Sequence, residues 1–199
     1  MTEIFRRFLL TFIPIFVAVD AIGNIPLFIS ITEGLSKKQR HKIVIDSVTT
    51  ATALAVVFML AGKWVLRLLN ITIADFQIAG GVLLFVIAAR LLLPGSHKAG
   101  LTNGHDRDAG VFPLGTPLIT GPAVLTTTLI MLDTFGPLAT YVSLAVNILI
   151  VWVALARADF FIKIMGIAGT RAFSKVMYIL LAAIAAMMVR RGISGAFLS

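Results

Sequence analysis

The sequence predicts an all-α, polytopic membrane protein with a single domain, and three observations support this fold class. First, 59% of the 199 residues are hydrophobic and only 13% are charged, whereas about a quarter of a soluble domain is charged. Second, six apolar stretches each approach the ~20 residues with which a helix crosses a ~30 Å hydrocarbon core. Third, two of these stretches are interrupted midway by Gly, Pro and polar residues.

The apolar stretches predict six transmembrane helices, at residues 8–31, 43–62, 72–93, 111–132, 136–157 and 174–194. The polar linker 94–108 divides them into two halves of three spans, so repeat one covers about 1–95 and repeat two about 109–199. An odd number of spans turns the second half upside down. We therefore expect two inverted three-helix repeats, with spans one and four broken near the midplane of the bilayer.

The first span contains the interruption Asp20-Ala21-Ile22-Gly23-Asn24-Ile25-Pro26. Backbone that leaves the helix at this depth is tolerated where it lines a cavity or is buried in protein. A carboxylate at bilayer depth indicates a functional site, so Asp20 is a candidate to bind a proton, a sodium ion or a substrate ammonium. A second role is open for the same residue, as a cap of a half-helix that begins near Asn24–Pro26. Gly23, Asn24 and Pro26 complete the first part of the candidate site.

The second and third spans contain little that points to chemistry. Asp46 and Asp75 lie near the expected span ends, where we interpret each as an interfacial cap rather than a ligand. The pair Gly80-Gly81 in span three is typical of close packing between two helices.

The fourth span contains the second interruption, and Thr116, Thr120, Gly121 and Pro122 form the second part of the candidate site. Thr120 follows Asn24 by 96 residues and Pro122 follows Pro26 by the same interval. A helix that restarts at Ala123 would present free N–H groups and a positive dipole end, which bind carboxylates. The hydroxyls of Thr126, Thr127 and Thr128 could add to this site or bond to their own helix backbone.

The fifth and sixth spans complete repeat two. Asn147 is the lone polar residue in the middle of span five, and we expect it to form a hydrogen bond between helices. The segment 159–175 before span six has mixed composition and is expected to contain a short interfacial helix.

Several function classes are excluded by composition. The chain has no cysteine, which excludes disulfides and thiolate sites, and its three histidines lie in loops without converging carboxylates, so we expect no metal. The net charge of +8 comes from basic residues at helix ends, where lipid headgroups explain it, so nucleic acid is not an expected partner. No catalytic or cofactor motif is present, and we expect neither an enzyme nor a cofactor.

The basic residues also predict the orientation in the membrane. Six of the 17 Lys and Arg residues lie on the side of the two termini, and the other eleven lie on the opposite side. The positive-inside rule then makes both termini periplasmic. Arg6 and Arg7 before an apolar run also fit a signal peptide, but hydrophobicity resumes after Pro26 and cleavage would destroy one copy of the repeat.

With these motifs the chain resembles the MarC family of bacterial inner-membrane proteins. The similar stretches are Phe16–Phe28, Phe76–Gly81, Pro113–Pro122 and Leu180–Gly192. The resemblance implies six spans, a place among LysE-like exporters and relatives that transport neutral amino acids. The family usually has Pro after the Asp and Gly after the second Gly-Pro, where this chain has Ala21 and Ala123.

Together these observations favour a secondary transporter of a small polar solute, such as a neutral amino acid, in the inner membrane. Asp20 and Asn24 would bind the ammonium group or a coupling H⁺ or Na⁺, and the N–H groups at Gly121–Val124, with Thr120, would bind the carboxylate. Two alternatives stay open: a non-transporting structural or regulatory membrane component, and a small-solute channel.

Overall fold

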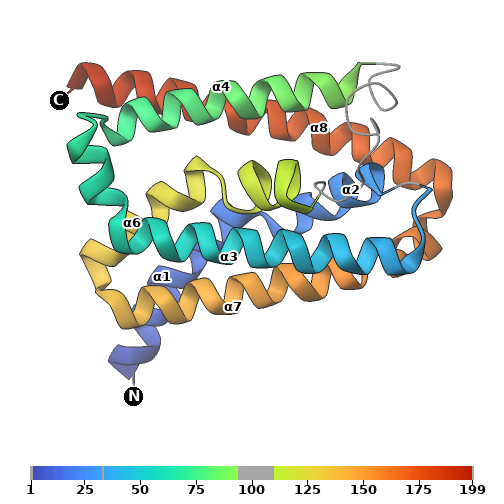
Figure 1. Cartoon of the computed structure of the whole chain (residues 1–199), viewed down its shortest axis with the longest axis horizontal. Coiled ribbons are helices and arrows are strands. Elements are labelled where there is room, and N and C mark those ends of the chain that lie inside the picture. The colour runs from blue at the N-terminus through green and yellow to red at the C-terminus, as the bar shows by residue number, and fades with distance from the viewer. Residues whose placement is uncertain (1, 33, 94–109, 199) are drawn as a thin grey trace.

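The computed structural model describes residues 2–32, 34–93 and 110–198, and the regular secondary structure of this part of the chain is all helical (Figure 1). The linker 94–108, with His97 and His105, lies outside the described residues. The helices are α1 (Thr2–Val19), α2 (Ala21–Ile31), α3 (Lys37–Leu68), α4 (Ile73–Leu92), the π-helix η1 (Gly110–Ile119), α6 (Pro122–Phe135), α7 (Pro137–Ala156) and α8 (Ala158–Leu198). The prediction of an all-α fold is confirmed.

Five helical segments of the described chain are long and apolar enough to cross a membrane. They are Glu3–Ile29, Lys37–Leu68, Ile73–Leu92, Pro137–Ala156 and Lys175–Phe197, and α6 is a shorter apolar helix. This confirms a polytopic membrane protein. The 14 residues of α6 measure about 21 Å, which is less than the ~30 Å of a hydrocarbon core. A span in this region must therefore include η1, which directly precedes α6.

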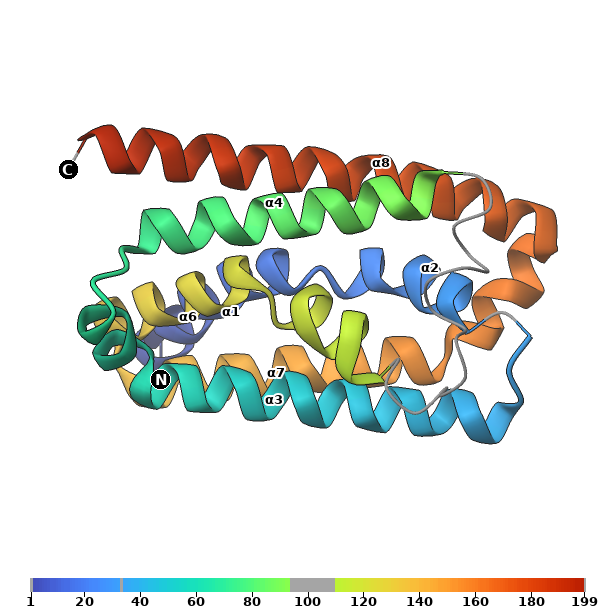
Figure 2. The same cartoon turned by 45° about the horizontal axis from the view of Figure 1, so that its top comes forward.

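The helices form three layers in both views of the structure (Figures 1 and 2). In Figure 2, α4 and α8 lie at the top, the interrupted segments α1–α2 and η1–α6 lie in the middle, and α3 and α7 lie at the bottom. Within this arrangement α4 packs along α8, α1 packs on α7, and η1 packs on α3. The two interrupted segments are thus covered by continuous helices on both sides.

Burial of the side chains follows these layers. In α2, the side chains of residues 23–29 are all buried, whereas Leu60 and Trp64 of α3 are 75% and 67% exposed. A helix that is apolar all round is buried in a core or lies in lipid. The buried α2 belongs to the core, and the apolar outer face of α3 is of the kind that faces lipid.

Glycines bring α4 close to its two neighbours, as the Gly80-Gly81 pair predicts. A Cβ atom on Gly80 would overlap the side chain of Pro122, and one on Gly81 would lie 2.8 Å from the carbonyl oxygen of Ala185. The first contact joins α4 to the start of α6, and the second joins it to α8. Small residues at such contacts let helix backbones approach in a membrane.

The capping of the helices confirms one expectation and corrects another. Asp75 caps α4 in a capping box with Thr72, as expected. Asp46 is not a cap, because Ser36 and Gln39 form a capping box that starts α3 at Lys37 and leaves Asp46 in the helix interior. The expected start of this span at residue 43 was therefore wrong by about two turns.

The sixth candidate span, Lys175–Phe197, starts at the expected place, but its helix begins further upstream. Helix α8 begins at Ala158 and continues to Leu198, with one non-helical residue, Gly166, at φ 67° and ψ 172°. Glycine adopts this conformation without a Cβ penalty. The short helix expected within 159–175 is thus the beginning of α8, and Gly166 separates it from the part that packs on α4.

We predict that Gly80→Ala lowers the free energy of unfolding by about 1–3 kcal/mol, because the new methyl group must displace Pro122 in a packed contact. Thermal unfolding in detergent measures this change. Gly195→Ala is the matched control, since its Cβ would make ordinary contact with Ala74 at 3.6 Å. Equal melting temperatures for the two variants would show that α4 and α6 do not pack closely.

Candidate functional site

The two interruptions predicted from the sequence lie near each other in the middle of the bundle. Both views place the break between α1 and α2 next to the break between η1 and α6 (Figures 1 and 2). Contacts of α1 with α6 and of α2 with η1 join the same two regions. The structure therefore brings the two parts of the candidate site to one place.

The first break is centred on Asp20, which has a left-handed backbone with φ 46°. Asp tolerates this conformation better than most residues. The backbone N–H of Gly23 donates to Oδ1 of Asp20 at 3.1 Å, so Asp20 caps α2. A Cβ on Gly23 would overlap the Asp20 carboxylate, which explains the glycine three residues after the aspartate.

The capping by Asp20 corrects the expected position of the second half-helix. The sequence favoured a start near Asn24–Pro26, but α2 begins at Ala21 and Pro26 lies inside it. Proline has no backbone N–H to donate, so the carbonyl oxygen of Ile22 accepts no backbone hydrogen bond from Pro26. Pro122, in contrast, is the first residue of α6. The two prolines therefore occupy different positions in their helices, although 96 residues separate them.

Asn24 is buried at 3% exposure and bonds to the broken backbone itself. Its Nδ2 donates to the carbonyl oxygens of Val19 at 2.8 Å and Asp20 at 3.1 Å. The Val19 carbonyl ends α1, where the regular helix pattern leaves carbonyl groups without partners, whereas the Asp20 carbonyl also accepts from the backbone N–H of Asn24 at 3.1 Å. The amide group thus has a structural role that the sequence did not indicate, while its Oδ1 atom is not used in these bonds.

The second break comprises Thr120 and Gly121, between the end of η1 and the start of α6. The buried Thr120 hydroxyl donates to the carbonyl oxygen of Ala51 in α3 at 3.0 Å. A Cβ on Gly121 would overlap the carbonyl group of Pro117, so a larger residue does not fit there. Gly121 is also the N-cap of α6 and offers no side chain to its first N–H groups.

Two buried oxygen atoms, one in η1 and one in α7, have no hydrogen-bond partner within the described part of the chain. They are Oγ1 of Thr116 in η1 and Oδ1 of Asn147 in α7. A buried polar atom without a partner costs about 1–3 kcal/mol. The hydroxyls of Thr126 and Thr128 differ, because they donate to Pro122 and Leu125 of their own helix. Of the two roles considered for these threonines, the structure shows backbone bonding.

The expected interhelical hydrogen bond of Asn147 is confirmed. Its Nδ2 donates to the carbonyl oxygen of Phe12 in α1 at 3.3 Å and to that of Ser143 at 2.8 Å. Ser143 donates to Phe8 at 3.4 Å, one turn away on the same contact. Sequence analysis missed Ser143, although its spacing of four residues from Asn147 places both on one face of α7.

A groove on the surface of the described chain lies away from the candidate residues. This groove of about 480 Å³ between α4 and α8 is lined by Val82, Phe85, Val189 and Arg190, among others, and by none of the candidate residues. No group of three His, Cys, Asp or Glu residues that could hold a metal ion occurs among the described residues. The candidate site is therefore defined by the two breaks and their polar atoms.

Comparison with known proteins gives one family and several relatives named as membrane proteins. The model of a family described as "MarC family integral membrane protein" matches residues 5–197. A UPF0056 membrane protein of Methanocaldococcus jannaschii is 32% identical over 98% of this chain and 90% of its own. The UPF0056 inner membrane protein YhgN of Escherichia coli is 28% identical over 88% of this chain and 90% of its own. No solved structure matches the chain.

We predict that Thr120→Val destabilises the protein by about 1 kcal/mol, because it keeps the shape of the side chain but removes the donor to Ala51. Thr134→Val is the control, since that exposed hydroxyl bonds only to Ile130 of its own helix. Chemical denaturation of both variants in detergent measures the difference. A larger loss for the Thr134 variant would contradict the structural role of Thr120.

Proposed function

The chain belongs to the MarC family of integral membrane proteins, and we propose that it is a secondary transporter of a small polar solute, a neutral amino acid. The observation that carries this proposal is the meeting of two helix breaks inside the bundle. Transporters bind their substrates between discontinuous helices in corresponding positions of two repeats. Such transport moves the solute without covalent chemistry.

We further propose six spans in two inverted repeats, with α1–α2, α3 and α4 in repeat one and η1–α6, α7 and α8 in repeat two. The packing supports this assignment. In this assignment α1 corresponds to η1, α3 to α7, and α4 to α8. The contact of α1 with α7 therefore corresponds to the contact of η1 with α3, and the contact of α4 with α8 is its own counterpart. The most extensive contacts thus have counterparts, as an internal two-fold axis requires.

Binding of an amino acid would use both breaks. In the proposal, the ammonium group or a coupling H⁺ or Na⁺ binds at Asp20 and at Oδ1 of Asn24. One carboxylate oxygen of Asp20 caps α2, while within the described chain no group donates to the other. The substrate carboxylate binds at the N-terminus of α6, where helix N–H groups favour anions. The hydroxyl of Thr116 has no partner among the described residues and lies close in sequence to the start of α6, so in the proposal it supplies one further donor to the carboxylate.

Localisation and orientation complete the proposal. The similarity to YhgN, whose name describes an inner membrane protein, supports the bacterial inner membrane. Figure 1 shows the two termini at the same end of the bundle, as an even number of spans requires. The unequal distribution of basic residues supports a periplasmic position for both.

Reporter fusions test the orientation. A periplasmic reporter joined after Ser199 should be active, and one inserted between residues 94 and 108 should be inactive, because the proposed topology assigns these points to opposite sides of the membrane. A cytoplasmic readout at Ser199 would contradict the proposed orientation.

We predict that Asp20→Asn leaves the protein folded but weakens amino acid transport about ten- to a hundredfold, the loss of one charge-assisted bond of 1.5–3 kcal/mol. Asn keeps the oxygen that caps α2, so uptake of neutral amino acids into proteoliposomes isolates the effect of the charge. Asp75→Asn is the control, because Asp75 is also a helix cap but is exposed at the start of α4. Normal transport by a folded Asp20→Asn protein would remove Asp20 from the mechanism.

A further inference from the structure

Helix α3 is joined to the other half of the protein by an ion pair at each of its ends. Near its start, Nη1 of Arg40 lies 2.6 Å from Oδ1 of Asp159, at the start of α8. Near its end, the ammonium group of Lys63 pairs with Asp133, in the last turn of α6. Partners in these pairs are 119 and 70 residues apart in sequence. Both pairs therefore connect the proposed repeats.

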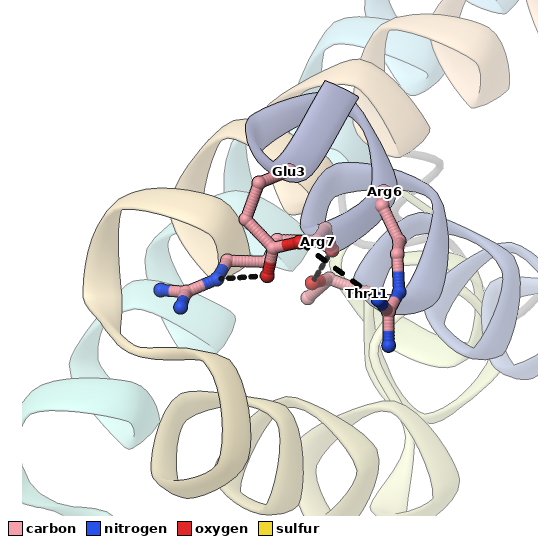
Figure 3. Close-up of polar contacts among 4 residues, drawn as sticks. All are labelled: Glu3, Arg6, Arg7 and Thr11. Atoms are coloured by element: carbon pink, nitrogen blue, oxygen red, sulfur yellow. Dashed lines mark hydrogen bonds and ion pairs between the residues drawn. The ribbon is translucent and has the colours of Figure 1, made fainter. Parts of the chain in front are cut away.

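The ion pairs at the N-terminus of the chain provide a contrast. Glu3 pairs with Arg6 and Arg7 within one helix, where Thr11 also donates to the Arg7 carbonyl group (Figure 3). Pairs three or four residues apart stabilise a single helix. They do not change when one half of the protein moves relative to the other, whereas the pairs of Arg40 and Lys63 must change.

The two long-range pairs lie at opposite ends of the bundle. The part of α3 between Arg40 and Lys63 spans about 35 Å at 1.5 Å per residue, similar to the ~30 Å thickness of a hydrocarbon core. In Figure 1 the ends of α3 lie at the two ends of the bundle, and both breaks lie between them. One pair is thus placed at each membrane surface.

Each pair also holds the outer end of one interrupted span. Nε of Arg40 donates to the carbonyl oxygen of Thr32, directly after α2, at 3.2 Å. Arg40 therefore ties the end of α2 to the start of α8. Asp133 belongs to the last turn of α6, so Lys63 ties the end of α6 to α3. The half-helices that lead from the breaks to the two surfaces are both fastened in this way.

If the two repeats are exchanged, each ion pair falls near the position of the other. An acidic residue then takes the place of a basic one, and a basic residue takes the place of an acidic one. Lys63 and Asp159 are 96 residues apart, the interval that separates Pro26 from Pro122. The same interval leads from Asp133 back to Lys37, one helical turn from Arg40. An inverted repeat would carry an ion pair at one surface to an equivalent pair at the other.

We propose that Arg40–Asp159 and Lys63–Asp133 are the two gates of the transport cycle, an inference that rests on the function proposed above. With both pairs closed, as in this structure, the breaks are separated from both surfaces. Opening one pair frees one half-helix and gives access from that surface alone. The pairs can open easily, because three of the four side chains are 43–57% exposed and exposed ion pairs are weak.

The absence of cysteine from the chain allows a direct test that needs no substrate. A single cysteine at Ala18, a half-buried residue just before the first break, reports access through its reaction with a membrane-impermeant maleimide. The labelling rate is measured in right-side-out and inside-out vesicles. Asp133→Asn should raise labelling only from the surface that carries the termini, and Asp159→Asn only from the opposite surface, each by up to about fivefold.

Further variants separate a gate from a general loss of structure. Lys63→Gln should reproduce the effect of Asp133→Asn, and the exchange Lys63→Asp with Asp133→Lys should restore the parent rate. Glu3→Gln is the matched control and should change neither rate. Labelling that stays unchanged, or that rises equally from both surfaces, would overturn the proposal.

The outcome is independent of whether the proposed function is correct. If labelling is one-sided but no amino acid is transported, the assignment of the two ion pairs as gates stands and the proposed substrate class is wrong. If transport is measured and labelling is not one-sided, transport is retained and the ion pairs are not its gates.

Discussion

The structure depends on how the protein satisfies backbone groups that two helix breaks release in an apolar environment. A peptide group without a partner costs several kcal/mol in hydrocarbon. At the first break the Asp20 carboxylate receives the Gly23 N–H, and the Asn24 amide donates to two carbonyl oxygens. At the second break the backbone N–H of Thr120 donates to the carbonyl oxygen of Gly115 at 3.2 Å, and its hydroxyl fastens the break to α3 through the carbonyl oxygen of Ala51. The three-layer arrangement then follows, since only burial between continuous helices can keep these bonds from lipid.

The same bonds explain why polar residues at the breaks have two kinds of role. Asn24 and Thr120 use their donors to hold the backbone, which reduces what they can offer to a bound solute. Thr116 keeps a buried hydroxyl without a partner in the described chain, and Asp20 keeps one carboxylate oxygen. In the proposed function, the solute supplies a donor to Asp20 and an acceptor to Thr116.

The sequence predicted the helical fold and the region of the breaks because both are local properties. Hydrophobic length marks the spans, and clusters of Gly, Pro and polar residues mark the regions of the two breaks, although Pro26 itself lies inside α2. The start of α2 could not be predicted in this way, since it depends on the left-handed conformation that Asp20 adopts. The bond between Thr120 and Ala51 and the pairs of Arg40 and Lys63 join residues 69 or more positions apart. Such contacts exist only once the helices have packed.

Gly166 gives α8 two mechanically distinct parts. The part after it packs along α4, and the part before it contains Asp159. A change in the two backbone dihedral angles of this one residue can swing the first part as a rigid arm, while the long interface between α4 and α8 remains intact. Motion at one membrane surface is thereby uncoupled from the helix pair that forms an entire layer of the bundle.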